Sequence, residues 1–159
     1  MTDTTTSKRA SAGSSSVGWT DEERAAMKQA ARERKTSARL SPDEQRAQGE
    51  RDLREAIAKM PADDRAMAER IHALVTEAAP TLVPKTYYGM PAYATEGKDG
   101  KTVCFFKPAS KFKERYSTFG FEQAARLDDG QMWPVSFALT ELTPGVEARV
   151  VELVKKAAG

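Results

Sequence analysis

Two helical segments with matching apolar stripes constrain most strongly what this chain can fold into. Residues 62–79 place apolar side chains at i, i+4, i+7, i+8 and i+11, and residues 144–157 repeat that spacing. The stripe residues are Met67, Ile71, Leu74, Val75 and Ala78, and Val146, Val150, Leu153, Val154 and Ala157. This spacing gives each helix one continuous apolar face. Because both faces must be buried, the helices need a common surface to cover.

The segment between these helices is expected to supply that surface as a β-sheet. Its apolar and aromatic runs predict a kinked strand over 85–93 and further strands over 102–107, 116–121 and 135–142. Short loops favour antiparallel pairing of neighbouring strands. The expected fold class is therefore α+β, an antiparallel sheet of about four to five strands with helices packed on one face.

Two more helices are predicted ahead of this sheet. Thr20 and Ser41 each precede a glutamate by three residues, which is the spacing of a capping box, so helices are expected over 21–38 and 42–59. The segment before them is rich in Thr, Ser, Gly and Ala and buries too little apolar surface to order itself. The expected parts are a disordered tail (1–18), a helical extension of two helices (19–60) and an α+β domain (61–159).

Charge and hydropathy narrow the expected location and partners. The formal net charge is only +2, whereas a dedicated nucleic-acid binder usually carries a dense basic stripe. No apolar run approaches the roughly 18 to 20 residues of a membrane-spanning helix. Lys8 and Arg9 are not followed by an apolar core, so they do not read as a signal peptide. We expect a cytoplasmic protein, with neither membrane nor nucleic acid as its partner.

Catalytic and metal-binding motifs are not evident. His72 is the only histidine, beside an apolar stripe rather than at its centre, and its spacing to Glu69 permits a local pair. Cys104 is the only cysteine and lies mid-strand, where burial and inertness are expected. There is no nucleophile elbow, H-E-x-x-H, C-x-x-C or calcium-loop pattern. We expect no enzyme, no cofactor and no assigned metal ligand, although an exposed oxygen-ligated iron site would leave little sequence signature.

The candidate binding site combines tyrosines with a basic loop. The run from Tyr87 to Tyr93 contains one glycine and one proline, which permit a ring-lined bend. The densest basic group follows the second strand, interleaved with aromatic residues that can stack on a planar ligand. A solvated connecting loop is the alternative. Trp133–Pro134 is a candidate cis bond at the same sheet end. The candidate binding residues are Tyr87, Tyr88, Met90, Tyr93, Lys107, Lys111 and Trp133.

Several short strings resemble one known family. They are Ala79-Pro80, Tyr88-Gly89-Met90-Pro91-Ala92-Tyr93, Val103-Cys104-Phe105-Phe106 and Lys111-Phe112. Over roughly residues 60–158 the chain resembles the YdhG-like family, a bacterial domain of unknown function. The resemblance implies a small α+β domain with a helix-covered antiparallel sheet. Some members are described as frataxin-like iron chaperones that deliver iron to iron–sulfur cluster or haem assembly.

The resemblance does not carry iron binding to any residue here. A frataxin-type chaperone would show an acidic ridge, whereas this chain is mildly basic. Phe112 follows Lys111 where many relatives have a histidine. The leading hypothesis is a non-enzymatic intracellular protein that binds a small anionic or aromatic molecule, or a partner protein, in the Tyr/Lys/Trp-lined groove. Iron delivery and a protein-interaction module formed by the N-terminal helices are the alternatives.

Overall fold

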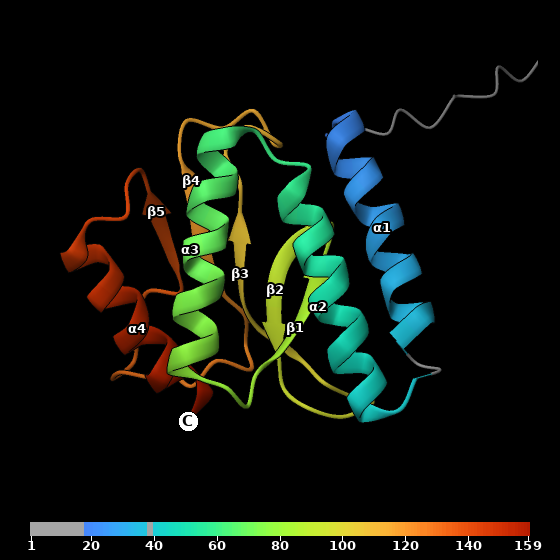
Figure 1. Ribbon diagram of the computed structural model, residues 1–159. Coiled ribbons are helices and arrows are strands. Elements are labelled where there is room, and N and C mark those ends of the chain that lie inside the picture. The colour runs from blue at the N-terminus through green and yellow to red at the C-terminus, as the bar shows by residue number, and fades with distance from the viewer. Residues whose placement is uncertain (1–17, 38–39) are drawn as a thin grey trace, which may run out of the picture.

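The fold is α+β, as the sequence predicts, with four helices and a five-stranded sheet among the described residues (Figure 1). A computed structural model describes residues 18–37 and 40–159. The elements are α1 (Asp21–Ser37), α2 (Pro42–Ala58), α3 (Ala62–Ala78), β1 (Val83–Tyr87), β2 (Met90–Ala94), β3 (Thr102–Lys107), β4 (Ser117–Phe121), β5 (Ser136–Leu139) and α4 (Pro144–Ala158). Apart from Gly18, the expected disordered tail over 1–18 lies outside the described residues.

The sheet is a meander in which every strand pairs antiparallel with its neighbour in sequence, in the order β1-β2-β3-β4-β5. The expected single kinked strand over 85–93 is wrong. That segment is a hairpin in which Tyr87 pairs with Met90 and Val83 with Ala94. The reason is local: Tyr88 and Gly89 reverse the chain, so the residues on either side pair with each other. Antiparallel pairing and the span of β3 are confirmed.

One face of the sheet carries the core. Leu53 of α2, Ile71 of α3 and Val154 of α4 are buried against aromatic side chains of the central strands, among them Phe106 and Phe119. The two predicted apolar stripes therefore meet a common surface, and α3 also packs beside α4 (Figure 1). The second helix contributes to this same core through its C-terminal half, as its apolar residues predict.

A glycine lets α2 approach the sheet closely. Gly49 is buried where α2 crosses β1, and a Cβ atom there would lie 1.9 Å from the carbonyl oxygen of Pro84. Arg46, one turn earlier, donates to the carbonyl oxygens of Pro80, Thr81 and Leu82. The α3–β1 connection is thereby fastened to α2, which fixes the position of β1 under the helix.

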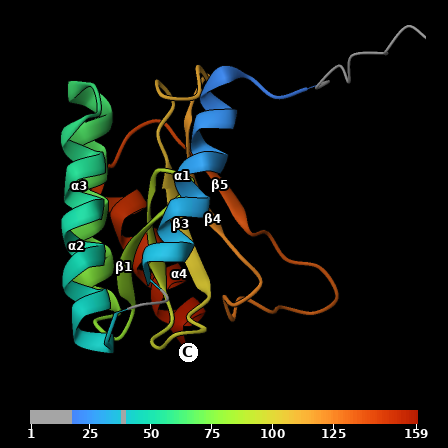
Figure 2. The same ribbon diagram turned by 90° about the vertical axis from the view of Figure 1, so that its right-hand side faces the viewer.

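The first helix lies alongside β1 at the edge of the sheet (Figure 2). Its buried apolar surface is small, because only Ala26 and Ala30 are fully covered. The predicted caps are present: the Glu23 amide donates to Thr20 Oγ1 at 3.1 Å, and the Glu44 amide donates to Ser41 Oγ at 3.3 Å. The position of α1 covers the backbone of an edge strand, which is otherwise open to pairing with another chain.

The peptide bonds and the helix lengths bear on two further features of the chain. No peptide bond among the described residues is cis, so the Trp133–Pro134 bond is trans. Within the described part of the chain, none of the helices combines the length and apolarity that crossing a bilayer requires.

Candidate functional site

The turn between β1 and β2 is the centre of the candidate site. Tyr88 has φ 52° and Gly89 has φ 76°, and positive φ at both central residues defines the type I′ turn that suits a two-residue hairpin. A Cβ atom on Gly89 would lie 2.4 Å from Lys111 Nζ. Glycine at this position therefore suits the left-handed backbone, and a side chain here would displace the Lys111 ammonium.

Lys111 reaches this turn from the loop that follows β3. Its ammonium donates to the carbonyl oxygen of Gly89 at 3.0 Å and lies 5.4 Å from the ring centre of Phe112. Burial lowers the pKa of Lys111, and the negative charge of Glu33 offsets only part of that effect. A partly buried cation is thus held against the turn.

Contacts on both sides hold the Lys111 loop. The Ser110 amide donates to Oδ2 of Asp64, a buried carboxylate in the first turn of α3, at 3.1 Å. Lys113 forms an ion pair of 3.0 Å with Glu22 in the first turn of α1. Because these partners belong to two different helices, the loop is positioned between α1 and α3 rather than left as a purely solvated connection.

Glu33 of α1 also approaches this turn. Burial raises the pKa of its carboxyl group, and the Thr86 and Gln29 side chains and the Gly89 backbone offset only part of that rise. Its Oε1 atom is buried and has no hydrogen-bond partner among the described residues. Such an atom is uncommon, because buried polar groups are almost always hydrogen-bonded.

A third ionisable group stands beside Glu33. Burial lowers the pKa of Lys85 in β1, while the attraction of Glu33 acts in the opposite direction and Arg34 adds to the lowering. Three partly buried charged side chains therefore surround one end of the first hairpin. Groups with pKa values perturbed by burial, gathered at a concave surface, are a recognised mark of functional sites.

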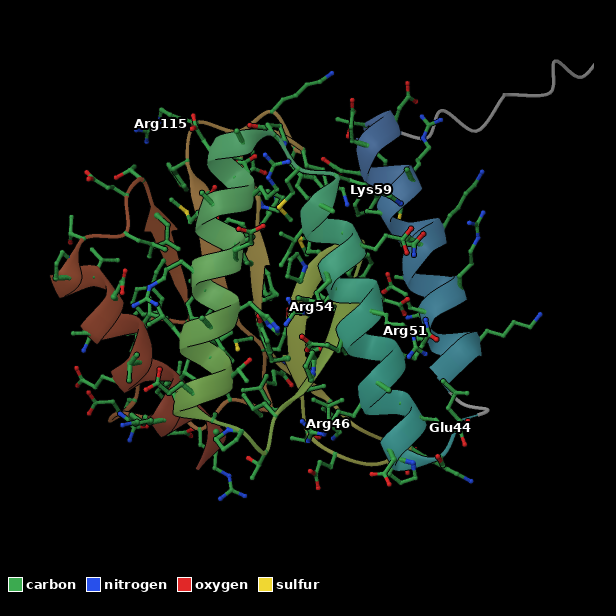
Figure 3. The ribbon with its side chains drawn as sticks, in the orientation of Figure 1. Glu44, Arg46, Arg51, Arg54, Lys59 and Arg115 are labelled. Atoms are coloured by element: carbon green, nitrogen blue, oxygen red, sulfur yellow. The ribbon has the colours of Figure 1, made fainter. Side chains whose placement is uncertain are left out.

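A cavity of about 690 Å³ opens between α1, α2 and this turn. Thr86 and Met60 are buried in its lining, Gly89 lines it at the turn, and Lys59 stands where the end of α2 approaches α1 (Figure 3). Its ionisable lining is balanced: Arg32, Lys59 and Lys111 are basic, and Glu33, Asp52 and Glu55 are acidic. The volume lies within the range of about 300–1,000 Å³ that is usual for small-molecule sites.

None of the three predicted tyrosines lines this cavity. Tyr87 contacts Tyr88 edge to face, with ring centres 4.5 Å apart, and stands 5.8 Å from Phe105. Burial and nearby Glu122 raise the pKa of Tyr87 to about 12, and its hydroxyl donates to Glu122 Oε1 at 3.4 Å. Met90 pairs with Tyr87 in the hairpin and is buried. These residues form an aromatic cluster on the sheet beside the turn.

Lys107 adjoins Lys111 through a shared aromatic ring. The ammonium groups of Lys107 and Lys111 lie 4.9 Å and 5.4 Å from the ring centre of Phe112. Lys107 also forms an ion pair with Glu114 in the same loop. The structure thus gathers Tyr87, Tyr88, Met90, Lys107 and Lys111 at one end of the sheet.

Tyr93 and Trp133 do not join that group. Tyr93 is 1% exposed and faces the core beneath α2 and α3. Trp133 belongs to the β4–β5 connection and packs partly against the core. Successive connections of an antiparallel meander leave alternate ends of the sheet, so the β4–β5 connection lies opposite the end that carries the Lys111 loop. The single groove predicted to contain all seven residues is therefore not formed.

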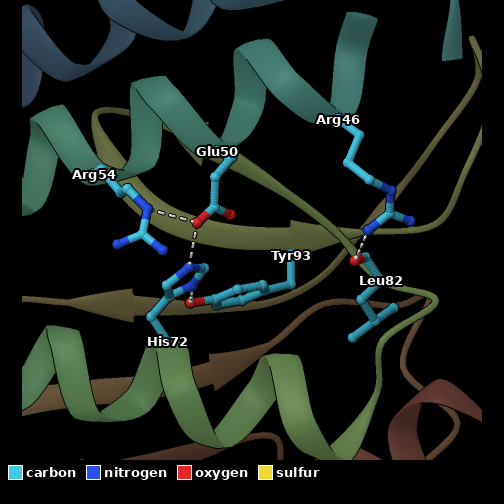
Figure 4. A network of polar contacts seen from close by, with 6 residues as sticks. All are labelled: Arg46, Glu50, Arg54, His72, Leu82 and Tyr93. Atoms are coloured by element: carbon cyan, nitrogen blue, oxygen red, sulfur yellow. Dashed lines mark hydrogen bonds and ion pairs between the residues drawn. The ribbon is translucent and has the colours of Figure 1, made fainter. Parts of the chain in front are cut away.

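A buried polar network that the sequence reasoning missed joins α2, α3 and β2 (Figure 4). His72 Nδ1 lies 2.9 Å from the Tyr93 hydroxyl, and His72 Nε2 lies 2.8 Å from Glu50 Oε1. Arg54 donates to the same oxygen of Glu50 at 2.7 Å. Both ring nitrogens of His72 are thus engaged by other elements, and not by Glu69, whose spacing would permit a local pair.

The carboxylate of Glu50 sets the direction of its own hydrogen bonds in this network. An ionised Glu50 only accepts, so the His72 ring donates to it from Nε2. Nδ1 accepts the Tyr93 hydroxyl proton in a neutral ring and donates to the hydroxyl oxygen in a charged ring. Burial alone would raise the pKa of Glu50, but His72 and Arg54 outweigh it and lower that pKa. One feature of the sequence could have indicated this network. Glu50 precedes Leu53 by three residues and Ile57 by seven, so its carboxylate lies on the same face of α2 as these buried apolar residues.

The network has the connectivity of a nucleophile, a base and an orienting acid. Its nucleophile position is closed, however, because burial raises the pKa of Tyr93 well above the ordinary range and its side chain is almost fully enclosed. Cys104 is fully buried as well, and burial raises the pKa of its thiol. We therefore interpret the network as a link between two helices and the sheet.

Metal-ligating side chains are dispersed in the described part of the chain, where no group of three or more His, Cys, Asp or Glu residues could hold an ion. No protein-family model, curated protein or solved structure matches this chain. The resemblance to the YdhG-like family stays a prediction from the motif strings. The fold and the site themselves define an α+β protein with a charge-balanced cavity beside its first hairpin.

Proposed function

We propose that this chain is a non-enzymatic, YdhG-like binding protein of the cytoplasm that takes a small polar molecule into the cavity between α1, α2 and the β1–β2 turn. This narrows the groove expected from the sequence to the part around Lys111. The aromatic cluster of Tyr87, Tyr88 and Phe105 supports the turn from the neighbouring face.

One observation carries this proposal. Glu33 and Lys111, side chains of opposite charge, are both partly buried against Gly89 and both line a cavity of ligand size. Keeping charged groups out of water destabilises a fold unless they are well paired. A binding role explains why such groups stand at a concave surface rather than in solvent.

An amide-shift titration of the isotope-labelled full chain tests the proposal. The panel contains inorganic anions, nucleotides, sugars, amines and amino acids. We expect at least one class to cause saturable shifts at Gly89, at Lys111 and along the cavity side of α1. Lys111→Met should weaken that response at least tenfold, because it removes the ammonium but keeps most of the side-chain volume.

Lys28→Met is the matched control, since Lys28 is exposed on α1 and does not line the cavity. It should leave the titration unchanged. Shifts confined to residues remote from the hairpin turn, or a spectrum that no member of the panel changes, would overturn the proposed site.

A further inference from the structure

The cavity is lined by a carboxylate, Glu33, that is only partly satisfied by its hydrogen bonds from Thr86, Gln29 and the Gly89 backbone. Glu33 Oε1 is buried without a hydrogen-bond partner in the described part of the molecule, and the Glu33 side chain lines the cavity. Leaving a buried acceptor atom without a hydrogen bond destabilises the fold, and the penalty is larger for a charged group. A ligand with an N–H group, above all a protonated amine, would add a further donor to this carboxylate.

The ammonium group of Lys111 in the same cavity can donate further hydrogen bonds. A lysine ammonium carries three N–H groups, and Lys111 donates one of them to the Gly89 carbonyl oxygen. Two N–H groups are then left for other acceptors. Carboxylate oxygens suit them best, because hydrogen bonds between two charged partners are the stronger class.

The balance of charge selects against simple ions. Three acidic and three basic side chains line the cavity, and Glu55 is already paired with Lys59 at 3.2 Å. A lone anion bound to Lys111 would also face Glu33, and a lone cation bound to Glu33 would also face Lys111. A molecule with both charges meets each partner and adds no net charge to a partly buried site.

Shape and lining set the size of such a molecule. The cavity measures about 690 Å³, which exceeds what the two charged ends of a small zwitterion need. Its remaining walls include small and apolar side chains, namely Ala25, Ala26, Ala56, Met60 and Pro61. These walls leave room for a side chain attached between the two charges.

We propose that the cavity binds an α-amino acid or a closely related zwitterion, with its amine on Glu33 and its carboxylate on Lys111. This inference rests on the proposed function, because it names the ligand class of the same site. The two ends of the ligand would be bound by α1 and by the Lys111 loop. These two segments are joined by the ion pair of Glu22 with Lys113, at 3.0 Å.

The test compares ligands that carry both charges with ligands that carry one. The labelled full chain is titrated with the common α-amino acids one at a time, and separately with acetate and with methylammonium chloride at matched ionic strength. We expect saturable shifts at Gly89 and Lys111 for at least one amino acid. Its dissociation constant should be at least tenfold lower than that of acetate or methylammonium.

Two substitutions separate the two charged contacts. Glu33→Gln and Lys111→Met should each weaken the amino acid at least tenfold. Glu77→Gln, an exposed carboxylate of α3, and Lys28→Met should leave binding unchanged. The ligand comparison on the unsubstituted chain needs no variant, so the inference is tested even where a substitution unfolds α1.

The outcomes distinguish this inference from the proposed function. If acetate or methylammonium binds as tightly as every amino acid, or a non-zwitterionic compound alone shifts the cavity amides, the ligand class is wrong and the binding site stands. If no compound shifts those amides, both are wrong.

Discussion

At the residue scale, a few side chains join elements of the fold through hydrogen bonds to residues far away in the sequence. His72 illustrates this, since its two ring nitrogens meet Tyr93 of β2 and Glu50 of α2. Hydrogen bonds of this kind contribute modestly when formed and cost more when one partner is lost inside the protein. Breaking one hydrogen bond of this network should therefore destabilise the protein by more than that bond contributes when it is formed, because a buried polar atom is left without a partner.

Removing the Tyr93 hydroxyl should destabilise the protein in this way. In Tyr93→Phe the buried Nδ1 atom of His72 loses its partner, so we expect the free energy of unfolding to fall by about 1–3 kcal/mol. Urea denaturation followed by circular dichroism measures the change. Tyr116→Phe is the control, because that ring is partly exposed beside Arg115 and should change stability by less than about 0.5 kcal/mol. Equal effects would contradict the role assigned to the network.

Acid should weaken the same network through Glu50. Its pKa is lower in the folded protein than in the unfolded chain, so its stabilising contribution is complete above the unfolded pKa near 4.5. That contribution is lost as the pH falls through the folded value. Comparing the free energy of unfolding of the parent and of Glu50→Gln between pH 7 and pH 3 checks this. The difference between them should shrink toward acid, and a constant difference would rule out the linkage.

At the element scale, two close approaches set where the helices and the loop lie. Gly49 lets α2 descend onto β1, and Gly89 lets Lys111 reach the hairpin turn. Neither requirement is visible as a periodic pattern. The glycine inside α2 reads from sequence only as a weak helix position. The glycine and the proline of the Tyr87–Tyr93 run predict a bend within one strand rather than a hairpin turn.

Substitution of Gly49 separates helix propensity from packing. Alanine favours a helix interior over glycine by about 1 kcal/mol, but here its Cβ atom would overlap the Pro84 carbonyl oxygen, and overpacking typically costs about 1–3 kcal/mol. We expect Gly49→Ala to lower the urea midpoint. Gly145→Ala in the first turn of α4 is the matched control, since the nearest neighbouring atom lies 4.0 Å away. It should be neutral or stabilising, and the same result at Gly49 would refute the packing argument.

At the scale of the whole molecule, α2 belongs to the core and α1 covers an edge. Leu53, Ile57 and Met60 are buried with residues of α3, α4 and the sheet. In α1, only Ala26 and Ala30 are fully buried, although its polar side chains complete the cavity. The two N-terminal helices therefore contribute unequally to the stability of the fold.

Two shortened chains should show this difference. A chain of residues 40–159 keeps α2, so we expect a cooperative thermal transition. A chain of residues 61–159 loses three buried apolar side chains worth about 1.5–3 kcal/mol each, which is comparable to the whole stability of a small protein, about 5–15 kcal/mol. We expect no cooperative transition for it in circular dichroism melts. An unchanged melting temperature for 61–159 would show that α2 is dispensable.

The sequence by itself determined the class of fold, the helices and most of the strand positions. These depend on local rules: the period of apolar residues, the capping side chains at Thr20 and Ser41, and short loops that favour antiparallel neighbours. Lys111 was also named from sequence as a candidate binding residue, because a basic loop with aromatic neighbours is a local pattern.

Only the tertiary structure decided which side chains meet. Glu33 and Lys111 are far apart in the chain, and they lie at one cavity because α1 covers the edge of β1 while the hairpin turn offers Gly89 between them. The alternation of connections likewise sends Trp133 to the other end of the sheet. Contacts of this kind depend on register and on the closest approach of elements, and no local periodicity encodes either quantity.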